Sequence, residues 1–360
     1  MEDKTILQIV VTQMEKVLIR MPNWVGDFIM ALPALENLQN WWSQKEFYII
    51  SRPHLSTLVP QGPNIKGFIP YPPRGGLGRF AQILRTARVL SKGKFHKAIL
   101  FQNAFEAAFV ARMGRIPEII GYNRDLRGFL LTRAIRYKRK REHHVYYYLG
   151  ILKAIGIEPV FQRPRLKCSE EELASGLSFL KDLGLNDSSP ILGIAPGAAY
   201  GPAKRWPLEY FRGVISHAVK KMGLFVLIFG SKEEKAIGEE LGSGRKMVEN
   251  LCGKTDLSLA KSVISFCSLF VSNDSGLMHM ASALDIPLVA IFGSTDPTVT
   301  GPLGPNSKVL RARTECAPCF MPRCPFGTYE CLRKIQVEEV LYNIESMLGG
   351  EGEKTGCVHR

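Results

Sequence analysis

Short apolar runs alternate along the chain with longer segments in which apolar residues recur at helical spacing. This alternation is typical of a parallel sheet whose strands are connected by helices. In the first part of the chain it predicts strands at Lys16–Arg20, Phe47–Ile50, Lys97–Phe101 and Glu118–Gly121. The helices that it predicts there span Asp27–Trp41, Gly78–Leu90, Ala104–Met113 and His144–Ile155.

The alternation breaks near residues 156–169, where two prolines and little periodicity predict a linker. Ser169 is followed by three glutamates, which is typical of the start of a helix. Beyond that helix the alternation predicts strands at Ile191–Ala195, Leu224–Phe229, Leu269–Ser272 and Leu288–Phe292. The helices predicted in this part span Leu208–Met222, Lys232–Leu241, Leu257–Phe266, Leu277–Leu284 and Val337–Leu348.

A chain of 360 residues with this pattern predicts an α/β protein made of two doubly wound, Rossmann-like domains that face each other across a cleft. We expect an N-terminal domain at 1–160, a linker and connecting helix at 161–185, a C-terminal domain at 186–348 and a flexible tail at 349–360. Ligands of such domains bind at the carboxyl ends of the strands. Site residues are therefore to be sought in the loops that lead from strands to helices.

Charge divides the chain more sharply than composition does. Hydrophobic residues make up 46% and charged residues 22%, which is ordinary for a globular protein. Residues 1–165 hold 26 Lys and Arg but 11 Asp and Glu, whereas residues 166–360 hold 21 and 22, so that the first half carries the whole net charge of +14. Either the first half meets an anionic partner, or the charge serves solubility.

No segment predicts a membrane span or export. The longest apolar stretches, such as Ile6–Val11 and Gly223–Gly230, are far shorter than the roughly 20 residues that a helix needs to cross a bilayer. The N-terminal sequence begins with acidic residues and has no small-residue cleavage pattern, unlike a signal peptide.

Two of the strand-to-helix loops carry charged side chains. Gly26 and Asp27 follow the first predicted strand, where glycine permits a close backbone approach. Asp27 either caps the helix or acts as a general base at the mouth of the cleft. Lys204 and Arg205 lie between the strand at 191–195 and the next helix. They are either solvated or neutralise a diphosphate leaving group.

A third loop has the sequence of an anion-binding helix start. The strand at 269–272 runs into Asn273 and Asp274, then a Ser275-Gly276 turn, and a helix is expected from Leu277. Free amides at a helix start bind anions without any cationic side chain. The chain has neither a GxxxxGK[ST] nor a GxGxxG motif. His279 either contacts the ligand or is a core histidine.

The late part of the chain is rich in cysteine. Four cysteines fall within sixteen residues in the pattern C-x2-C-x4-C-x6-C, namely Cys316, Cys319, Cys324 and Cys331. Four thiolates can hold zinc in a tetrahedron, and a site closed by four side chains is structural rather than catalytic. The spacing is not that of a standard zinc ribbon or finger, so free thiols remain the alternative.

Three segments together resemble one enzyme family. They are WVGD at 24–27, PGAAYGPAKRWP at 196–207 and NDSGLMHMASALDIPLVAIFGSTDP at 273–297. They are similar to the ADP-heptose:lipopolysaccharide heptosyltransferases, glycosyltransferase family 9, and most of all to its type II enzymes. The similarity extends from about Lys16 to Leu348, nearly the whole chain.

The resemblance implies a GT-B fold in which the second domain binds the nucleotide sugar and the first binds the acceptor. It implies inverting, metal-independent transfer of L-glycero-D-manno-heptose from ADP-heptose to the inner core of lipopolysaccharide, with the second heptose favoured. The acceptor is then Kdo-lipid A or heptosyl-Kdo-lipid A at the cytoplasmic face of the inner membrane. A basic first half would attract both that acceptor and an anionic leaflet. We expect a monomer that needs no cofactor for catalysis.

Residue by residue, the resemblance implies that Asp27 is the general base and that Lys204 stabilises the departing ADP. The acceptor-side loop would contain Asn23, Trp24 and Gly26. The donor-binding residues that it implies are Arg205, Glu233, Asp274, Ser275, Gly276, Leu277, Met278 and His279.

Two other functions fit parts of the sequence. One is a transferase or epimerase that uses another nucleotide sugar on the same fold, because fold does not determine function. The other is a basic zinc-knuckle protein that binds nucleic acid. Against the second, the clustered cysteines lie in the neutral half and the basic half shows no recognised nucleic-acid motif. We therefore expect no nucleic-acid partner.

Overall fold

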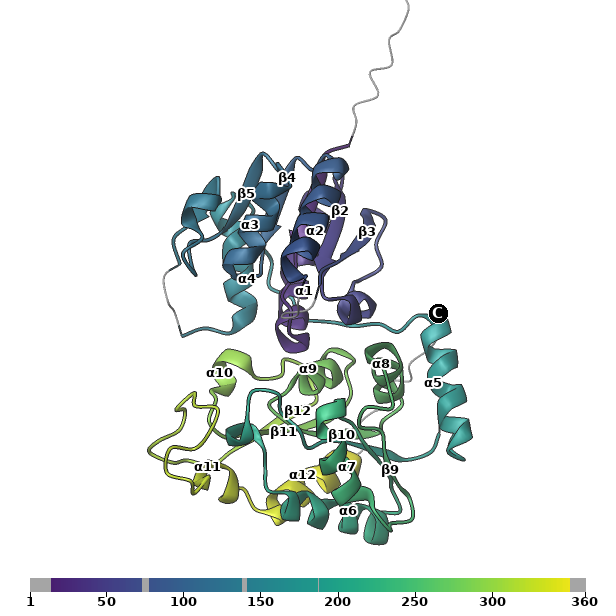
Figure 1. Cartoon of the computed structure of the whole chain (residues 1–360). Coiled ribbons are helices and arrows are strands. Elements are labelled where there is room, and N and C mark those ends of the chain that lie inside the picture. Colours follow the sequence, from purple (N-terminus) through teal and green to yellow (C-terminus); the bar gives the residue numbers. More distant parts are fainter. Residues whose placement is uncertain (1–13, 73–77, 138–140, 187, 350–360) are drawn as a thin grey trace, which may run out of the picture.

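Six parallel strands form the sheet of the first half, in the order β3-β2-β1-β4-β5-β6 (Figure 1). The computed structural model describes residues 14–72, 78–137, 141–186 and 188–349. The strands are β1 Lys16–Arg20, β2 Glu46–Ser51, β3 Ile65–Pro70, β4 Lys97–Leu100, β5 Glu118–Tyr122 and β6 Arg133–Ile135. The helices are α1 Val25–Trp41, α2 Arg79–Gly93, α3 Phe105–Met113 and α4 His144–Ala154, with 3-10 turns η1 Pro53–Leu58 and η2 Gly128–Leu130.

The second half repeats this topology, because β12-β11-β10-β7-β8-β9 is the same order counted from β7. Its strands are β7 Ile191–Ala195, β8 Phe225–Ile228, β9 Val248–Asn250, β10 Leu269–Asn273, β11 Leu288–Phe292 and β12 Ser307–Arg311. Its helices are α6 Leu208–Met222, α7 Lys235–Gly242, α8 Leu257–Ser265, α9 Gly276–Ala283, α10 Pro297–Thr300, α11 Glu330–Arg333 and α12 Val337–Gly349, with 3-10 turns η3 Pro202–Lys204 and η4 Lys232–Glu234.

This order of strands is that of the Rossmann fold, so the predicted fold class is confirmed in both halves. The interior strands β7, β10 and β11 are buried along their whole length, because helices cover both faces of a parallel sheet. All eight predicted strands are present, and β3, β6, β9 and β12 are additional. Of the predicted tail only Gly349 is described, as the last residue of α12. None of the helices in the described ranges is long and apolar enough to cross a bilayer.

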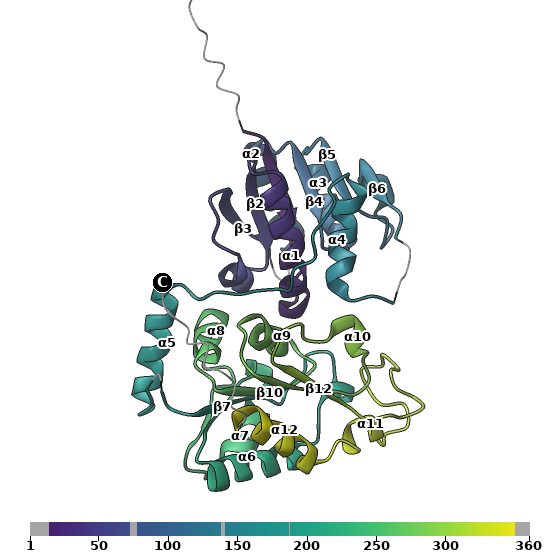
Figure 2. The ribbon, with the colours of Figure 1, turned by 180° about the vertical axis from the view of Figure 1, so that it is seen from behind.

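An extended segment and α5 (Glu170–Asp182) connect the two halves, as Figure 2 shows. The amide of Leu166 in this segment donates a hydrogen bond of 2.8 Å to the carbonyl of Ala283 at the end of α9. Helix α5 begins with a capping box in which Ser169 and Glu172 bind each other's backbone amides, which confirms the predicted helix start. The connecting segment therefore lies along the second half before α5 packs on α8.

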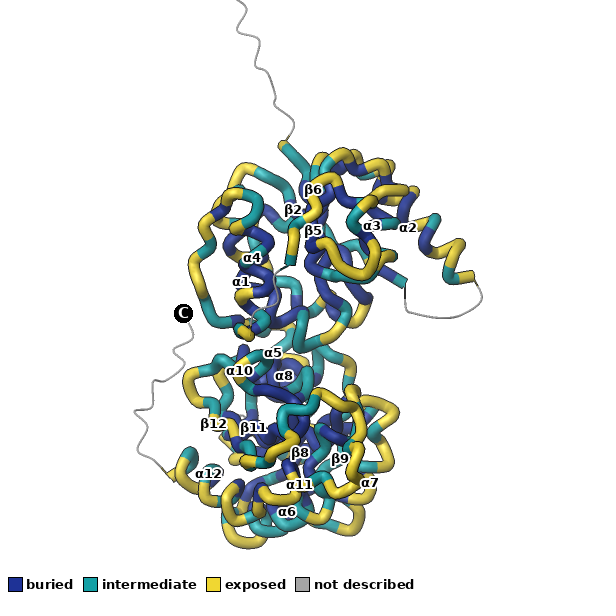
Figure 3. The backbone as a smooth tube through the Cα atoms, turned by 90° about the vertical axis from the view of Figure 1, so that its left-hand side faces the viewer, coloured by how far each residue is buried: buried dark blue, intermediate teal, exposed yellow. Residues whose placement is uncertain are grey.

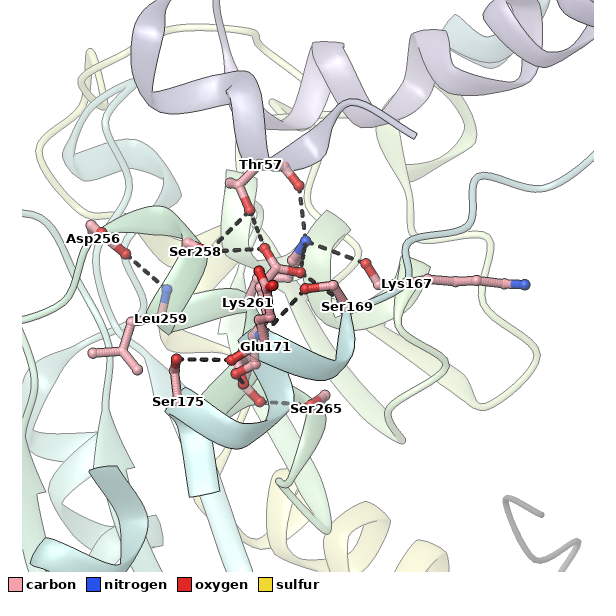
Figure 4. A network of polar contacts seen from close by, with 12 residues as sticks. Thr57, Lys167, Ser169, Glu171, Ser175, Asp256, Ser258, Leu259, Lys261 and Ser265 are labelled. Carbon is pink, nitrogen blue, oxygen red and sulfur yellow. Dashed lines mark hydrogen bonds and ion pairs between the residues drawn. The ribbon is translucent and has the colours of Figure 1, made fainter. Parts of the chain in front are cut away.

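An ion pair between a buried lysine and a partly buried glutamate, which we call the clasp, joins the halves beside this segment (Figure 4). Lys261 of α8 is 3% exposed, and its ammonium lies 2.7 Å from the carboxylate of Glu172. It also donates a hydrogen bond of 2.8 Å to the carbonyl of Thr57 in η1. Burial alone would raise the pKa of Glu172, but hydrogen bonds from Lys261, Thr57, the Ser169 amide and Ser258 lower it to about 2. The clasp is therefore charged at neutral pH and joins the first half to the second.

The halves meet again near the strand ends. Arg141, ahead of α4, lies 2.6 Å from the carboxylate of Asp296, the buried N-cap of α10. The next-but-one residue, His143, lies with its Nε2 atom 2.9 Å from the carbonyl of Gly301. In Figure 3 the residues where the two halves face each other are coloured mostly as buried or intermediate. The relative position of the halves is thus fixed by polar contacts at two separate places.

Candidate active site

Asp27 lies where the strand order of the first sheet reverses, between β1 and β4. Helix α1 begins at Val25 and its N-cap position is Trp24, which makes no side-chain capping bond. Asp27 is therefore the third residue of the helix, and its interpretation as the N-cap is wrong. A carboxylate in the first turn is still favoured by the helix dipole. Ligands of open α/β sheets bind at such a reversal point.

The Asp27 carboxylate is free of tight partners. Its side chain is 34% exposed, and within the described part of the chain the ion pair recorded for it is with His144, whose Nδ1 atom lies 3.8 Å from Oδ1. That separation is too long for a hydrogen bond. His144 is the first residue of α4 and is itself partly exposed. A carboxylate in this state is able to accept a proton from a bound hydroxyl.

A cavity of about 240 Å³ opens beside Asp27 at the ends of β1, β4 and β5. It is smaller than the ~300–1,000 Å³ of pockets that enclose drug-sized ligands, so it has room for one sugar unit and not for an oligosaccharide. Its lining is rich in aromatic side chains and consists of Pro22, Trp24, Asp27, Phe101, Gln102, Asn103, Ala104, Arg124, Asp125, Tyr137, His144, Tyr147 and Tyr148.

A buried arginine fixes the wall of this cavity. Arg127 is fully buried, and its guanidinium donates to the carbonyl of Tyr122 at 3.0 Å and to the side-chain oxygen of Asn103 at 3.2 Å. The hydroxyl of Tyr147 donates to the same oxygen at 2.8 Å. At the edge of the cavity, the exposed guanidinium of Arg124 lies 5.3 Å from the ring centre of Tyr137. The cavity thus combines fixed aromatic faces with one accessible cation.

Across the domain interface, the second half supplies a lysine. Lys204 ends η3 after β7, and its ammonium lies 2.5 Å from the carboxylate of Asp274. Asp274 follows β10 and is 5% exposed, and it also accepts a hydrogen bond of 2.6 Å from the hydroxyl of Thr295. β7 and β10 are the equivalents of β1 and β4. The lysine and its carboxylate are therefore placed at the reversal point of the second sheet.

Asn273 ties together the two loops of this half. Its side-chain oxygen accepts a hydrogen bond of 3.0 Å from the amide of Trp206, and its side-chain nitrogen donates one of 2.7 Å to the carbonyl of Pro196. Arg205, an expected donor-binding residue, donates instead to the carbonyl of Ala198 at 3.1 Å. In this structure Arg205 therefore shapes the loop that carries Lys204.

Helix α9 points its N-terminus at the start of α1. Ser275 is its N-cap and accepts a hydrogen bond of 3.4 Å from the amide of Met278. A β-carbon on Gly276 would lie 2.8 Å from Cβ of Val25, and one on Gly26 would lie 2.7 Å from Cδ2 of His279. Both distances are too short for any side chain. Glycine at both helix starts allows the predicted acceptor loop and the predicted donor loop to meet.

His279 lies among the charged residues of both loops. Burial lowers the pKa of His279 to about 4, against the opposing effect of the nearby carboxylates of Asp274 and Asp27. Lys204 is also close enough to lower that pKa. The ring is therefore neutral at neutral pH. Together with the contact between the starts of α1 and α9, these electrostatic interactions indicate that Asp27, Asp274 and Lys204 lie near His279.

Glu233, another expected donor-binding residue, follows β8 in the second half. It lies in η4, and its side chain is exposed. The neighbouring Glu234 accepts a hydrogen bond of 2.8 Å from the amide of Ser231 and so caps its own turn. Of the predicted helix start, Met278 is buried and Leu277 is partly buried. Backbone amides and Ser275, rather than those apolar side chains, are thus the groups available to a donor.

The four clustered cysteines are all free, and they differ in exposure. Burial raises the pKa of Cys331 to about 11, and the other three thiols add to that rise because they lie near it. In the described ranges, no three His, Cys, Asp or Glu side chains are placed so that they could hold a metal ion. Structural zinc at Cys316, Cys319, Cys324 and Cys331 therefore stays a prediction.

Sequence reasoning missed several groups that build the site. The His143-His144 pair at the start of α4 was visible as two adjacent histidines, but nothing local showed that α4 packs beside α1. Thr295 and Arg127 act through contacts over 21 and 24 residues of sequence, to Asp274 and Asn103. Such contacts follow only from the tertiary fold.

Two facing Rossmann domains with a carboxylate on one side of the cleft and a lysine and helix start on the other define a glycosyltransferase of the GT-B fold. A model of "Glycosyltransferase family 9 (heptosyltransferase)" matches residues 83–330. The chain belongs to that family.

Individual relatives agree along nearly the whole chain. It is 29% identical over 340 residues to the lipooligosaccharide heptosyltransferase 2 of Campylobacter jejuni, which covers 92% of this chain and 98% of that protein. It is 29% identical over 350 residues to the lipopolysaccharide heptosyltransferase 2 of Salmonella typhimurium, covering 94% and 99%. The solved structure of Escherichia coli ADP-heptose lps heptosyltransferase II superposes with a TM-score of 0.80 at 26% identity, covering 92% and 98%.

Proposed function

We propose that this glycosyltransferase transfers L-glycero-D-manno-heptose from ADP-heptose to the inner core of lipopolysaccharide, and that it adds the second heptose. The names of its relatives support both the donor and the acceptor class. The acceptor is heptosyl-Kdo-lipid A, with Kdo-lipid A as the alternative if the enzyme adds the first heptose. The protein acts as a monomer, with no nucleic acid and no cofactor in the reaction, at the cytoplasmic face of the inner membrane.

The single observation that carries the proposal is the meeting of α1 and α9. Gly26 and Gly276 let the two helix starts touch, so that the partly exposed Asp27 lies beside the helix start that would hold the donor phosphates. A base on the acceptor side and an anion-binding helix start on the donor side are what a direct displacement requires.

In the reaction, the Asp27 carboxylate takes the proton of the acceptor hydroxyl. The oxygen of that hydroxyl attacks the anomeric carbon of the heptose from the face opposite the diphosphate. A new carbon–oxygen bond forms, the bond to the ADP oxygen breaks, and its electron pair leaves with ADP. One displacement inverts the configuration at the anomeric carbon.

The negative charge that develops on ADP is stabilised by Lys204 and the free amides at the start of α9. Lys204 is held 2.5 Å from Asp274, which is in turn held by Thr295. We infer that Asp274 orients the ammonium before the donor arrives, and that the diphosphate then shares it. With these groups in place the leaving group needs no metal ion.

The acceptor sugar occupies the cavity beside Asp27. Its aromatic lining suits the apolar face of a pyranose ring, and Arg124 at its edge suits an acidic group of the glycolipid. The net positive charge of the first half favours the same anionic acceptor.

The experiment combines purified enzyme, ADP-heptose and defined Kdo-lipid A acceptors that carry no heptose or one heptose. Mass spectrometry of the products is expected to show one added heptose, chiefly on the acceptor that already carries one. Transfer only to the heptose-free acceptor would contradict the proposed position. Thermal stabilisation by a UDP- or GDP-sugar but not by ADP-heptose would contradict the proposed donor.

A further inference from the structure

An exposed apolar patch lies on the first half, next to the acceptor cavity but outside it. Leu126 is 89% exposed and Phe129 is 77% exposed, and both lie in the segment between β5 and β6. The ring of Phe129 lies 6.1 Å from that of Phe105 in α3, which in turn stacks on Phe109 at 6.1 Å. Figure 3 looks onto this side, where α3 and β5 are neighbours. We call Phe105, Phe109, Leu126 and Phe129 the apolar patch.

The turn that presents Leu126 is built at a conformational cost. Asp125 and Leu126 both have positive φ, 52° and 57°, a region that residues other than glycine adopt rarely. The turn is closed by a backbone hydrogen bond of 3.1 Å from Arg127 to Arg124, and the buried guanidinium of Arg127 anchors it. A strained backbone held by the surrounding structure is typical of functional segments. Here it directs a large apolar side chain into solvent.

Cations flank the patch and are accessible. Arg124 precedes Leu126 by two residues and is exposed, and Arg112 is exposed one helical turn beyond Phe109 on α3. The nearby acid Glu106 forms an ion pair with Arg79 and accepts a hydrogen bond from the hydroxyl of Tyr71. Exposed aromatic and aliphatic side chains between exposed arginines are complementary to a bilayer surface with anionic headgroups. The net charge of the first half acts in the same direction.

The patch also continues into the proposed acceptor site. Ala104 and Asp125 line the cavity beside Asp27, and they are the immediate chain neighbours of Phe105 and Leu126. A surface that touches the patch would therefore present its headgroups at the mouth of the cavity.

We propose that the apolar patch docks this enzyme on an anionic lipid bilayer, with Leu126 and Phe129 inserted at the level of the headgroups. The proposal rests on the proposed function, because a glycolipid acceptor is embedded in such a surface. It adds which face of the first half meets the lipid. The bound orientation brings the sugar of the acceptor to Asp27 without moving its acyl chains out of the bilayer.

The test uses the full chain with Leu126→Ser and Phe129→Ser combined, and Tyr342→Ser as the control. Tyr342 is 71% exposed on α12 of the second half, far along the chain from the patch. Cosedimentation is measured with vesicles of phosphatidylglycerol and phosphatidylethanolamine, and with vesicles of phosphatidylcholine alone. Heptose transfer is measured on acceptor in the anionic vesicles and on a deacylated acceptor in solution.

The double variant is expected to lower the partition into anionic vesicles by about 10- to 100-fold, as loss of two inserted apolar side chains implies. The rate of transfer to the embedded acceptor should fall in parallel with vesicle binding, whereas the rate of transfer to the deacylated acceptor should match that of the unmodified enzyme. Tyr342→Ser should match the unmodified enzyme in vesicle binding and in both rates. Wild-type binding to phosphatidylcholine should be weak.

Vesicle binding that the double variant leaves unchanged would overturn the docking proposal, even if heptose transfer is confirmed. The docking proposal would also be overturned if the unmodified enzyme is a dimer and the double variant is a monomer, because a second copy would then cover the patch. If the double variant loses vesicle binding but the unmodified enzyme transfers no heptose, the proposed function is contradicted and the docking proposal is supported.

Discussion

The two halves share one strand order, yet the carboxylates at the reversal points of their two sheets are in opposite states. Asp27 follows β1, and its side chain is 34% exposed. Within the described residues it forms an ion pair with His144 alone, whose Nδ1 atom lies 3.8 Å from its Oδ1 atom. Asp274, after β10, is buried and held by Lys204 and Thr295. Both lie at the reversal point of their sheet. The topology determines where a functional side chain lies, and its partners determine what it does.

The difference between Asp27 and Asp274 indicates that the two carboxylates have different roles. An accessible, loosely partnered carboxylate is suited to proton transfer, whereas a buried and doubly hydrogen-bonded one is suited to holding a lysine in place. Removing each should therefore have distinct effects: the first on chemistry alone, the second on the loop that carries Lys204.

The largest effect is expected for Asp27→Ala. The rate of transfer should fall by about 10²–10⁴-fold, because the acceptor hydroxyl loses its general base. The melting temperature should fall only slightly, since Asp27 makes no capping bond and only its interaction with the helix dipole is lost. Asp125→Asn removes another carboxylate from the same cavity, with a residue that tolerates the positive φ of this position, and should keep most of the activity. Steady-state kinetics measure the rates and a thermal melt measures the stability. Near-normal turnover of Asp27→Ala would contradict the assignment of Asp27 as the general base.

Lys204→Ala should have the next largest effect. Loss of the cation that faces the diphosphate should lower the chemical rate by about 10²–10³-fold. Arg212→Ala is the control, because Arg212 lies on α6 in an exposed ion pair with Glu240 and should change little. Rapid-quench measurement of single turnovers isolates the chemical step. Equal rates in the two variants would show that Lys204 does not stabilise the leaving group.

Lys261→Met probes the clasp that joins the halves rather than either site. It leaves the partly buried carboxylate of Glu172 without its cation and removes the hydrogen bond to the carbonyl of Thr57, which should cost about 1.5–3 kcal/mol of unfolding free energy. Lys153→Met breaks an exposed pair with Glu158 and should cost less than about 1 kcal/mol. Chemical denaturation measures both variants. Similar losses would show that the clasp is no stronger than a surface ion pair.

The same clasp predicts a dependence on pH. The pKa of Glu172 is about 2 in the folded protein against an ordinary value of 4.5, so the unfolded chain takes up a proton first as the pH falls. Its contribution to stability is complete above pH 4.5 and is lost as the pH falls toward 2. Unfolding free energies measured across that range should decrease less steeply in Glu172→Gln. Parallel curves would contradict the pairing.

The smallest expected effect concerns the cysteine-rich loop, which lies only in the second half. Structural zinc predicts about one equivalent of metal in the purified protein, measured by elemental analysis, with little change in turnover after its removal because the site is closed. Replacing Cys316 by Ser should release that metal. Less than about half an equivalent of zinc or iron would count against a tetrahedral site.

Interior and edge strands differ in how well the sequence predicts them. The eight predicted strands are the interior ones, where burial on both faces gives continuous apolar runs such as those of β10 and β11. The four additional strands β3, β6, β9 and β12 are the four sheet edges, and their residues are largely half-buried or exposed. An edge strand has one neighbour, so its apolar pattern is weak.

The site shows a similar division. Asp27, Lys204 and Asp274 follow interior strands, so their loops were predictable from the alternation of elements. The partners that determine their states were not: His144 reaches Asp27 from a helix 117 positions later in the numbering, and Thr295 reaches Asp274 from the end of the next strand. The pattern of a sequence locates strand ends, but only the packed structure shows which side chains meet there.

The central claim is that Asp27 moves a proton and does not bind the donor. It is tested by titrating Asp27→Asn with ADP-heptose in a calorimeter and then adding acceptor to the same sample and following single-turnover product formation. Asp27→Asn should bind ADP-heptose with the dissociation constant of the unmodified enzyme and form almost no product. Product at near the normal rate, or loss of ADP-heptose binding, would contradict it.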